Sequence, residues 1–284
     1  MRGKSVSLAK LTTLKVGGPG EVWEVNSLAD LRAASSAPYR VIGAGSNLLI
    51  GDAGVPERVI KLGPAYNDIK NYSGQQDVWL GAATPVPGLV RRSAEVGMSG
   101  LEGLLGVPAV LGGAITMNAG TRFGSMANTL KEVEVFLDGK LQRLDASELG
   151  LSYRHSALPE GAVIVRARLE FTPSTPEQVQ AKLKEVDAAR KGQPKIKSAG
   201  CAFKNPQGDS AGRLIDVAGL KGLEVGGAMV SLEHGNFIVN TGKATGKDVM
   251  ELLSLIKDKI SIPLEIEWEL WGFDEAAMRN KVTL

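Results

Sequence analysis

Cysteine and histidine are scarce in this sequence. Its 284 residues contain one cysteine, Cys201, and two histidines. A single cysteine cannot form a disulfide within the chain, so the fold has to be stable without such cross-links. Zinc sites are built from clusters of cysteine and histidine, and the sequence has no such cluster. We therefore predict a protein without a bound metal.

A surplus of one charge and long hydrophobic runs are also lacking. The chain has 33 basic and 31 acidic side chains, for a formal net charge of +2. This balance argues against nucleic acid or an anionic membrane as the partner. The apolar run at 107–117 is interrupted by Pro108 and two glycines, so no segment is expected to cross a membrane. Residues 1–10 lack the apolar stretch of a signal peptide, and we expect a cytoplasmic protein.

Glycine, by contrast, is abundant, with 35 residues concentrated in the first half of the chain. Glycine-rich backbone can turn tightly and approach a ligand closely, so this distribution indicates a cofactor. Short helices and strands alternate irregularly along the sequence. This irregular order predicts an α+β fold rather than a regular βαβ array.

Helix caps and alternating apolar residues predict the individual elements. Helices are expected from Ser27, over 85–94, from Thr175 to a stop at Gly192, and from Thr245 to the turn at 261–263. Asp138-Gly139 predicts the turn of a hairpin. Strands are expected at 21–25, 40–42, 59–62, 78–80, 133–137, from 141 onward, at 162–171 and at 264–270.

Two glycine loops are candidate phosphate binders. The first, at 41–47, follows a strand and offers consecutive N–H groups, as an anion-binding nest does. It is not a Rossmann fingerprint, because Leu48 replaces the third glycine and residues 50–54 stand where a helix would begin. In the second loop, at 100–120, Pro108 can occupy the first turn of a helix whose N–H groups point at a diphosphate. For each loop alone, tight structural turns are the alternative.

Cys201 lies between a glycine and a polar, basic turn in the segment SAGCAFKNP at 198–206. A lone cysteine most often packs as a small hydrophobic residue. In this polar setting the thiol can instead serve as a proton donor. Position alone leaves both interpretations open.

Ordered motifs along nearly the whole chain, from Thr12 to Gly272, resemble one known family. They are GAGSNLLIGDAGV at 43–55, GLEGLLGVP at 100–108, GGAITMNAG at 112–120, YRHS at 153–156, SAGCAFKNP at 198–206, AGRLIDVAGLKG at 211–222 and SLEHGNFIVNTGKAT at 231–245. Together they resemble the UDP-N-acetylenolpyruvoylglucosamine reductases, also called UDP-N-acetylmuramate dehydrogenases. These are FAD enzymes of peptidoglycan synthesis in the bacterial cell wall.

The resemblance implies a fold and a reaction. The fold is an FAD-binding domain of the vanillyl-alcohol-oxidase (PCMH) type, with two lobes at 1–65 and 66–175. A substrate-binding α+β domain at 176–262 and a strand and tail at 263–284, which returns to the FAD-binding domain, complete it. In the implied reaction NADPH reduces the FAD. The enolpyruvyl ether of UDP-N-acetylglucosamine then receives a hydride at C3 from flavin N5 and a proton at C2.

Three residues match catalytic positions of the family. Arg154 matches the arginine that stabilises negative charge, and a guanidinium suits a carboxylate because it binds bidentately and stays protonated. Cys201 matches the proton donor, which is serine in many members, and a thiol with an ordinary pKa of about 8.5 gives up a proton more readily than a hydroxyl. Periodicity does not choose among Glu265, Glu267 and Glu269. Aligning Trp271-Gly272 with the closing pair of the family selects Glu267 as the catalytic acid.

The resemblance also implies binding residues. Tyr153, Lys191, Lys204 and Asn205 match positions that contact the substrate, whereas His155, Gln193 and His234 are expected to hold loops. No partner other than the sugar nucleotide and NADPH is implied, and we expect a monomer. The implied FAD contacts are Gly43, Ala44, Gly45, Ser46, Asn47, Leu48, Gly106, Val107, Pro108, Gly112, Gly113, Asn118, Ala119 and Gly120.

Two features set the chain apart within the family. Members commonly have Gly-Ser or Gly-Thr where this chain has Ala109-Val110, so a hydroxyl contact to the flavin diphosphate is absent and weaker FAD retention is expected. The stretch between Arg154 and Cys201 is too short for the tyrosine-bearing insertion of one branch. This chain therefore resembles the shorter branch.

Two other functions compete with this one. A sugar or lactone oxidase of the same flavin fold would share the glycine loops, but it has no need of Arg154, Cys201 and Glu267. A non-catalytic nucleotide-binding protein would likewise have no need of a proton donor.

Overall fold

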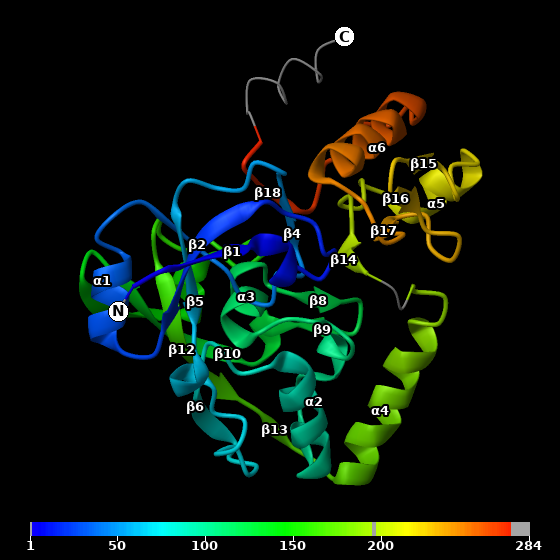
Figure 1. Ribbon diagram of the computed structural model, residues 1–284. Helices are drawn as coiled ribbons and strands as arrows, with labels where there is room; N and C mark the ends of the chain where they lie inside the picture. The colour runs from blue at the N-terminus through cyan, green and yellow to red at the C-terminus, as the bar shows by residue number, and fades with distance from the viewer. Residues whose placement is uncertain (1, 195–196, 274–284) are drawn as a thin grey trace. The chain divides into compact units, whose positions relative to one another are not determined.

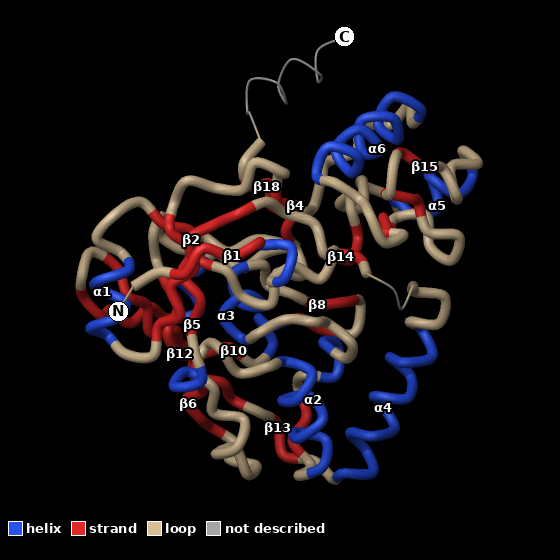
Figure 2. The backbone as a smooth tube through the Cα atoms, in the orientation of Figure 1, coloured by secondary structure: helices blue, strands red, loops and turns tan. Residues whose placement is uncertain are grey.

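The computed structural model describes residues 2–194 and 197–273, and it divides the chain into two compact units. Unit 1 consists mainly of residues 22–44 and 58–191. Unit 2 consists of residues 4–21 and 45–57 together with the described residues after 191. Figure 1 traces the chain by residue number and Figure 2 by type of secondary structure. Each unit is thus assembled from separate stretches of sequence.

Four antiparallel strands form the main sheet of unit 1, in the spatial order β11, β10, β12, β6. Asp138 and Gly139 between β10 and β11 both have positive φ, as a type I′ hairpin turn requires. The predicted hairpin is therefore confirmed. The strands are β6 (Asp77–Gly81), β10 (Leu130–Leu137), β11 (Lys140–Asp145) and β12 (Val163–Glu170).

The core of unit 1 lies between this sheet and three helices, α2 (Val86–Glu95), α3 (Leu111–Thr116) and α4 (Pro176–Ala189). Leu89 of α2 and Ile115 of α3 are fully buried with the sheet residues of this core. Helices α2 and α4 are in contact, and Figure 1 shows them side by side. Both helices begin as predicted.

A second, smaller core in unit 1 forms around α1 (Leu28–Ala34), where Trp23 and Leu31 are buried. The side chain of Ser27 accepts a hydrogen bond of 3.1 Å from the N–H of Asp30, which confirms the predicted helix start. Residues 22–25 of strand β2 (Pro19–Val25) belong to unit 1. The other short elements of unit 1 are β3 (Tyr39–Val41), β5 (Arg58–Leu62), η2 (Pro64–Tyr66), β7 (Met98–Ser99), η3 (Glu102–Leu104), β8 (Gly120–Thr121), β9 (Gly124–Ser125), η4 (Met126–Asn128), η5 (Ala146–Leu149) and β13 (Thr172–Pro173).

Unit 2 contains an antiparallel sheet in the order β14, β17, β16, β15. Its longest helix, α6, begins with the predicted capping box of Thr245 and Asp248, and its apolar face, including Leu252 and Ile256, is fully buried. The elements are β1 (Lys4–Ser7), η1 (Leu8–Lys10), β4 (Leu48–Ile50), β14 (Ser198–Cys201), α5 (Ala211–Val217), β15 (Glu224–Val225), β16 (Ala228–Val230), β17 (Phe237–Asn240), α6 (Gly246–Lys259) and β18 (Glu269–Trp271).

Residues from the N-terminal part of the chain complete unit 2. The carboxylate of Asp52 accepts hydrogen bonds from the N–H groups of Gly246 (2.7 Å) and Lys247 (3.0 Å), at the start of α6. The side chain of Asn240 donates to the carbonyl of Leu14 at 3.0 Å. Because free N–H groups at a helix start favour a negative charge, Asp52 stabilises α6 from a distant part of the sequence.

The strand predicted at 264–270 is wrong in its extent. Only β18 is a strand, and it pairs in parallel with β4. Residues 264–268 are outside it, and Ile266 makes one isolated bridge to Phe203. The alternation there reflects burial of Leu264 and Trp268 in the core of unit 2 rather than a continuous ladder.

The expected lobes and the expected substrate-binding domain are named after the ligands that they would bind. The two units follow from internal packing alone and do not test those boundaries, which stay a prediction. Helix α4 packs within unit 1, on α2 and η3. The expected C-terminal tail lies outside the described residues from position 274 onward. None of the helices in the described part of the chain is both long enough and apolar enough to cross a bilayer.

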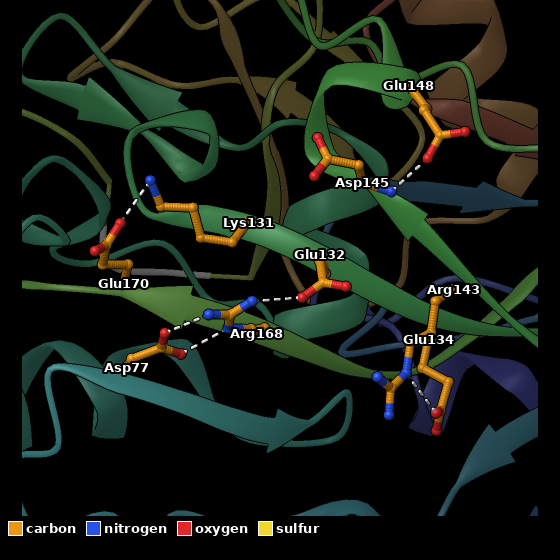
Figure 3. Close-up of polar contacts among 9 residues, drawn as sticks. All are labelled: Asp77, Lys131, Glu132, Glu134, Arg143, Asp145, Glu148, Arg168 and Glu170. Atoms are coloured by element: carbon orange, nitrogen blue, oxygen red, sulfur yellow. Dashed lines mark hydrogen bonds and ion pairs between the residues drawn. The ribbon is translucent and has the colours of Figure 1, made fainter.

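Glu134 is a buried charge of the main sheet with partners on both neighbouring strands. Its carboxylate accepts two hydrogen bonds from Arg166 on β12, at 2.8 and 3.0 Å, and Arg143 on β11 lies 3.5 Å away. Figure 3 shows Glu134 beside Arg143, together with Arg168 between Asp77 and Glu132 on the same sheet. The hydrogen bonds from Arg166 hold the pKa of Glu134 below its ordinary value.

We predict that Glu134→Gln lowers the free energy of unfolding by about 1 kcal/mol at neutral pH, a modest value because both arginines are partly exposed. A carboxyl whose pKa is lowered by folding stabilises the fold above its unfolded pKa of about 4.3 and loses that contribution as the pH falls through the folded pKa. Urea denaturation should therefore show the difference shrinking in acid. The exposed control Glu160→Gln should match the wild type, and a pH-independent difference would contradict the prediction.

Candidate active site

Residues from the two glycine loops meet in unit 1 at Gly43. A Cβ atom added to Gly43 would lie 3.0 Å from Cγ2 of Val110 and 3.9 Å from Cα of Gly113. A Cβ on Gly112 would lie 3.0 Å from Cβ of Ala82. The two loops that the sequence marks as phosphate binders are therefore adjacent, although they are far apart in the chain.

Gly113 differs from these glycines because the space beside it is open. A Cβ at this position would meet no heavy atom within 4 Å. Small residues that line an open space next to a helix start form a cradle in which backbone can approach a bound nucleotide. The residues present thus fit the FAD that the resemblance implies.

The start of α3 differs from the prediction. The helix begins at Leu111 and not at Pro108, which is exposed and lies in a connecting segment. The N–H groups of Leu111 and Gly112 donate to the carbonyls of Thr84 and Ala82, both at 2.9 Å. These two donors are thereby used within the protein, so α3 does not present its whole first turn to a phosphate.

Gly106 and Val107 form the turn between η3 and α3. Gly106 has a φ of 75°, and its carbonyl accepts a hydrogen bond of 3.2 Å from Arg190, the residue that ends α4. A Cβ on Gly106 would lie 2.9 Å from Nε of that arginine. The guanidinium thus covers the glycine and holds the turn.

The segment Asn118-Ala119-Gly120 follows α3 and is held by its own side chain. Buried Asn118 has a φ of 39°, donates to the carbonyl of Ser152 at 2.9 Å and accepts from the N–H of Ala127 at 3.0 Å. Its amide therefore holds the loop in place.

Arg154 lies beside this segment. Its Nη1 donates to the carbonyl of Gly120 at 2.9 Å, and its guanidinium lies 5.2 Å from the ring centroid of Tyr153, which is 56% exposed. Arg154 also has a φ of 56°, an unfavourable value for a residue with a side chain. Such strain is typical of functional positions, and the loop bonds around Arg154 maintain it.

In unit 2, the remainder of the first loop is fixed by its backbone. Gly45 has a φ of 62°, and a Cβ there would lie 2.2 Å from the carbonyl oxygen of Leu11. The side chain of Asn47 donates to the carbonyl of Glu267 at 3.3 Å, and the backbone carbonyl of Asn47 accepts from the N–H of Glu269 at 3.0 Å. Ser46 is half-buried, whereas Leu48 is buried in β4. Asn47 therefore connects a predicted cofactor loop to the predicted catalytic glutamate.

Cys201 is half-buried at the end of β14, opposite Phe237 of β17. The next residue, Ala202, donates its N–H to the carbonyl of Asn236 at 2.8 Å. The carbonyl of Ala202 accepts a hydrogen bond of 2.8 Å from the N–H of Glu267. This bond places the backbone of Glu267 next to the backbone that carries the thiol.

The three glutamates of the C-terminal segment occupy different environments. Glu265 is exposed and forms an ion pair of 2.6 Å with Lys204, and exposed Glu269 accepts a hydrogen bond of 2.7 Å from the indole of Trp271. Glu267 is half-buried, and both its N–H and its carbonyl are hydrogen-bonded. Glu267 is thus the least exposed of the three glutamates.

Three predicted substrate residues have structural contacts of their own or lie at the surface. The charge of Lys204 is paired with Glu265, and the side chain of Asn205 accepts from the N–H of Ala211 at the start of α5, at 3.1 Å. Lys191 is exposed just after α4. Within the described residues no group of three acidic, cysteine or histidine side chains could hold a metal ion.

Sequence reasoning missed the role of Asn236. This buried amide accepts from the N–H of Phe203 at 2.9 Å and donates to its carbonyl at 2.8 Å. His234, two residues earlier, accepts from the N–H of Asn236 at 3.2 Å, and burial lowers the pKa of the imidazole. The motif His-Gly-Asn was visible, but it does not reveal which distant strand the asparagine holds.

Comparison with family models assigns two domains. Residues 16–145 match an FAD binding domain, and residues 193–271 match the C-terminal domain of UDP-N-acetylenolpyruvoylglucosamine reductase. These matches confirm the predicted flavin-binding fold with a C-terminal α+β domain.

Individual proteins match over nearly the full length. A UDP-N-acetylenolpyruvoylglucosamine reductase of Thermus thermophilus is 55% identical over 95% of this chain and 100% of its own. The reductase of Deinococcus radiodurans is 50% identical, over 95% and 96%. The crystal structure of the Thermus caldophilus reductase superimposes with a TM-score of 0.90 at 55% identity, over 96% of this chain and 100% of its own.

The fold and these matches define an FAD-dependent oxidoreductase with a separate C-terminal domain. More narrowly, the chain belongs to the UDP-N-acetylenolpyruvoylglucosamine reductase family, in the short type represented by the Thermus proteins.

We predict that Gly113→Ala weakens FAD binding about tenfold or more, because the added methyl group enters the space assigned to the cofactor. The apoprotein should be no less stable, since alanine is the better helix former. Titration of apoprotein with FAD, followed by flavin fluorescence, measures the affinity.

The matched control is Gly88→Ala in α2, where a Cβ would make ordinary contacts of 3.5 and 3.7 Å with Ile69. Its FAD affinity should equal that of the wild type. Equal affinity in both variants would show that the space beside Gly113 is not part of the cofactor site.

Proposed function

We propose that this protein reduces the enolpyruvyl ether of UDP-N-acetylglucosamine to UDP-N-acetylmuramate, with FAD as cofactor and NADPH as reductant. Membership of the reductase family supports the reaction. The observation that carries the assignment of residues is the hydrogen bond from Glu267 to Ala202, which joins the segments of the acid and of the thiol.

The cofactor would be held by the adjoining glycine loops. The backbone around Gly43 and at 110–113 lines the open space beside Gly113, and Val110 packs where the family commonly has a hydroxyl. FAD, when bound, supplies the hydride that NADPH delivers to it. The protein supplies orientation and the proton.

Arg154 would bind the carboxylate of the enolpyruvyl group. Hydride addition at C3 pushes electron density toward C2 and this carboxylate, so the transition state is more negative there than the substrate. A fixed guanidinium stabilises that charge without reorganisation. The hydrogen bond to Gly120 and the ring of Tyr153 position Arg154 for this role.

Cys201 would deliver the proton to C2, and Glu267 would act with Arg154 on the forming enol. A thiol is a competent general acid near neutral pH. Tyr153, Lys191, Lys204 and Asn205 would contact the sugar nucleotide. Lys204 and Asn205 would then bind the ligand in addition to their present partners, which are Glu265 and the start of α5.

We also place the enzyme in the cytoplasm as a monomer. The location follows from its reactants, since NADPH and UDP-sugars are cytoplasmic metabolites. The two rival functions are weaker candidates, because neither a sugar oxidase nor a binding protein needs a proton donor beside a held glutamate.

We predict that Cys201→Ala allows NADPH to reduce the flavin at the normal rate but slows flavin reoxidation by the enolpyruvyl sugar by about 100-fold or more, as loss of general acid catalysis would. Cys201→Ser should retain activity, because the hydroxyl keeps a transferable proton. Anaerobic stopped-flow absorbance separates the two half-reactions. Normal reoxidation in the alanine variant would refute the role of the thiol.

Among the three glutamates, only Glu267→Gln should slow flavin reoxidation strongly. Glu265→Gln and Glu269→Gln are matched controls in the same segment. The first removes an exposed ion pair, and the second removes a charge but keeps an oxygen that can accept from the indole of Trp271. We expect those two variants to stay within about threefold of the wild type. Similar losses in all three variants would remove the special role of Glu267.

A further inference from the structure

The β8–β9 hairpin of unit 1 ends in two exposed side chains, Arg122 and Phe123, that have no role in the account above. The guanidinium carbon of Arg122 lies 4.9 Å from the ring centroid of Phe123, which is 40% exposed. Within residues 2–194 and 197–273, Arg122 makes no side-chain hydrogen bond or ion pair. A guanidinium in contact with an aromatic ring keeps N–H donors available for an anion.

The hairpin holds this pair in place. Thr121 donates its hydroxyl to the carbonyl of Gly103 at 3.0 Å and accepts from the N–H of Phe123 at 3.2 Å. A Cβ on Gly103 would lie 2.5 Å from the carbonyl oxygen of Gly124, so the hairpin packs directly on η3. The tip is therefore fixed by backbone contacts on both strands.

The base of the same hairpin carries the contact to Arg154. Gly120, the first residue of β8, accepts the hydrogen bond from Nη1 of Arg154. Two residues of extended chain span at most about 7 Å, so Arg122 begins close to the backbone that positions Arg154. The structure thus places a second arginine, Arg122, two residues along the chain from the carbonyl that bonds Arg154.

Both nucleotides of the proposed reaction, NADPH and the enolpyruvyl sugar nucleotide, carry a diphosphate. Phosphate oxygens are the preferred bidentate partners of a guanidinium fork. We propose that Arg122, supported by Phe123, binds the diphosphate of the incoming nucleotide and so positions its reacting end near Arg154. This inference rests on the proposed function for the identity of the two ligands, NADPH and the enolpyruvyl sugar nucleotide.

The test uses the FAD-loaded enzyme and measures the two half-reactions separately. Arg122→Ala should raise the apparent Kd of NADPH in flavin reduction, that of the enolpyruvyl sugar in flavin reoxidation, or both, by about 10- to 100-fold. The limiting rates at saturation should change little. Arg122→Lys should recover part of the affinity, and Phe123→Ala should give a smaller loss.

A salt series adds a readout that a purely structural role would not change. The Kd should rise with ionic strength more steeply in the wild type than in Arg122→Ala, because the variant lacks one charge contact. NADH should be weakened as much as NADPH, since both have the diphosphate. A loss seen with NADPH but not with NADH would assign Arg122 to the 2′-phosphate instead and overturn the proposal.

The matched control is Arg91→Ala, which removes an exposed arginine of α2. Equal losses in Arg91→Ala, or unchanged Kd values in Arg122→Ala, would overturn the proposal. Failure of the proposed function looks different, because the wild-type flavin would then be reduced by NADPH but not reoxidised by the sugar nucleotide. The NADPH measurement would still test Arg122 in that case.

Discussion

The backbone at Ala202–Lys204 is hydrogen-bonded from two sides, and the arrangement of unit 2 around Cys201 depends on it. On one side Asn236 bonds Ala202 through its carbonyl and Phe203 through its side chain. On the other side the segment 265–267 bonds Ala202 and Lys204. Backbone hydrogen bonds are costly to leave unmade, so the backbone next to Cys201 and the backbone of Glu267 are held together. Two residues far apart in sequence thereby share one framework.

The candidate cofactor site of unit 1 depends on glycines, which have no side chain. Val110 and Gly113 can approach Gly43 because Gly43 lacks a Cβ. The space beside Gly113 is open because Gly113 itself lacks a Cβ. Val110, the N-cap residue of α3, packs a methyl group next to Gly43. Of the backbone N–H groups at the start of α3, those of Leu111 and Gly112 are already used within the protein.

Local signals predicted local structure well. The caps at Ser27 and Thr245 and the turn at Asp138-Gly139 are formed by neighbours in sequence, so the residues themselves determine the geometry. The alternation at 264–270 predicted too long a strand, because Leu264 and Trp268 are buried in the core of unit 2 without a ladder and only β18 is a strand. The roles of Asn236, Asn240 and Asp52 depend on partners that no local pattern reveals. The predicted catalytic residues, Arg154, Cys201 and Glu267, came from the family motifs and not from periodicity.

Unit 2 contains residues that come before most of unit 1 in the sequence and residues that come after it. This order affects how the chain folds while it is being synthesised. Asn47 and Glu267, which bond each other, are 220 positions apart, and the apolar strand β4 finds its partner β18 only in that late segment. A chain made from its N-terminus folds its early domains first. On the ribosome, residues 45–57 must remain without these partners while the whole of unit 1 is translated. The second unit is consequently the last to mature, and a message truncated before the β18 codons yields a polypeptide with an apolar, unpaired strand.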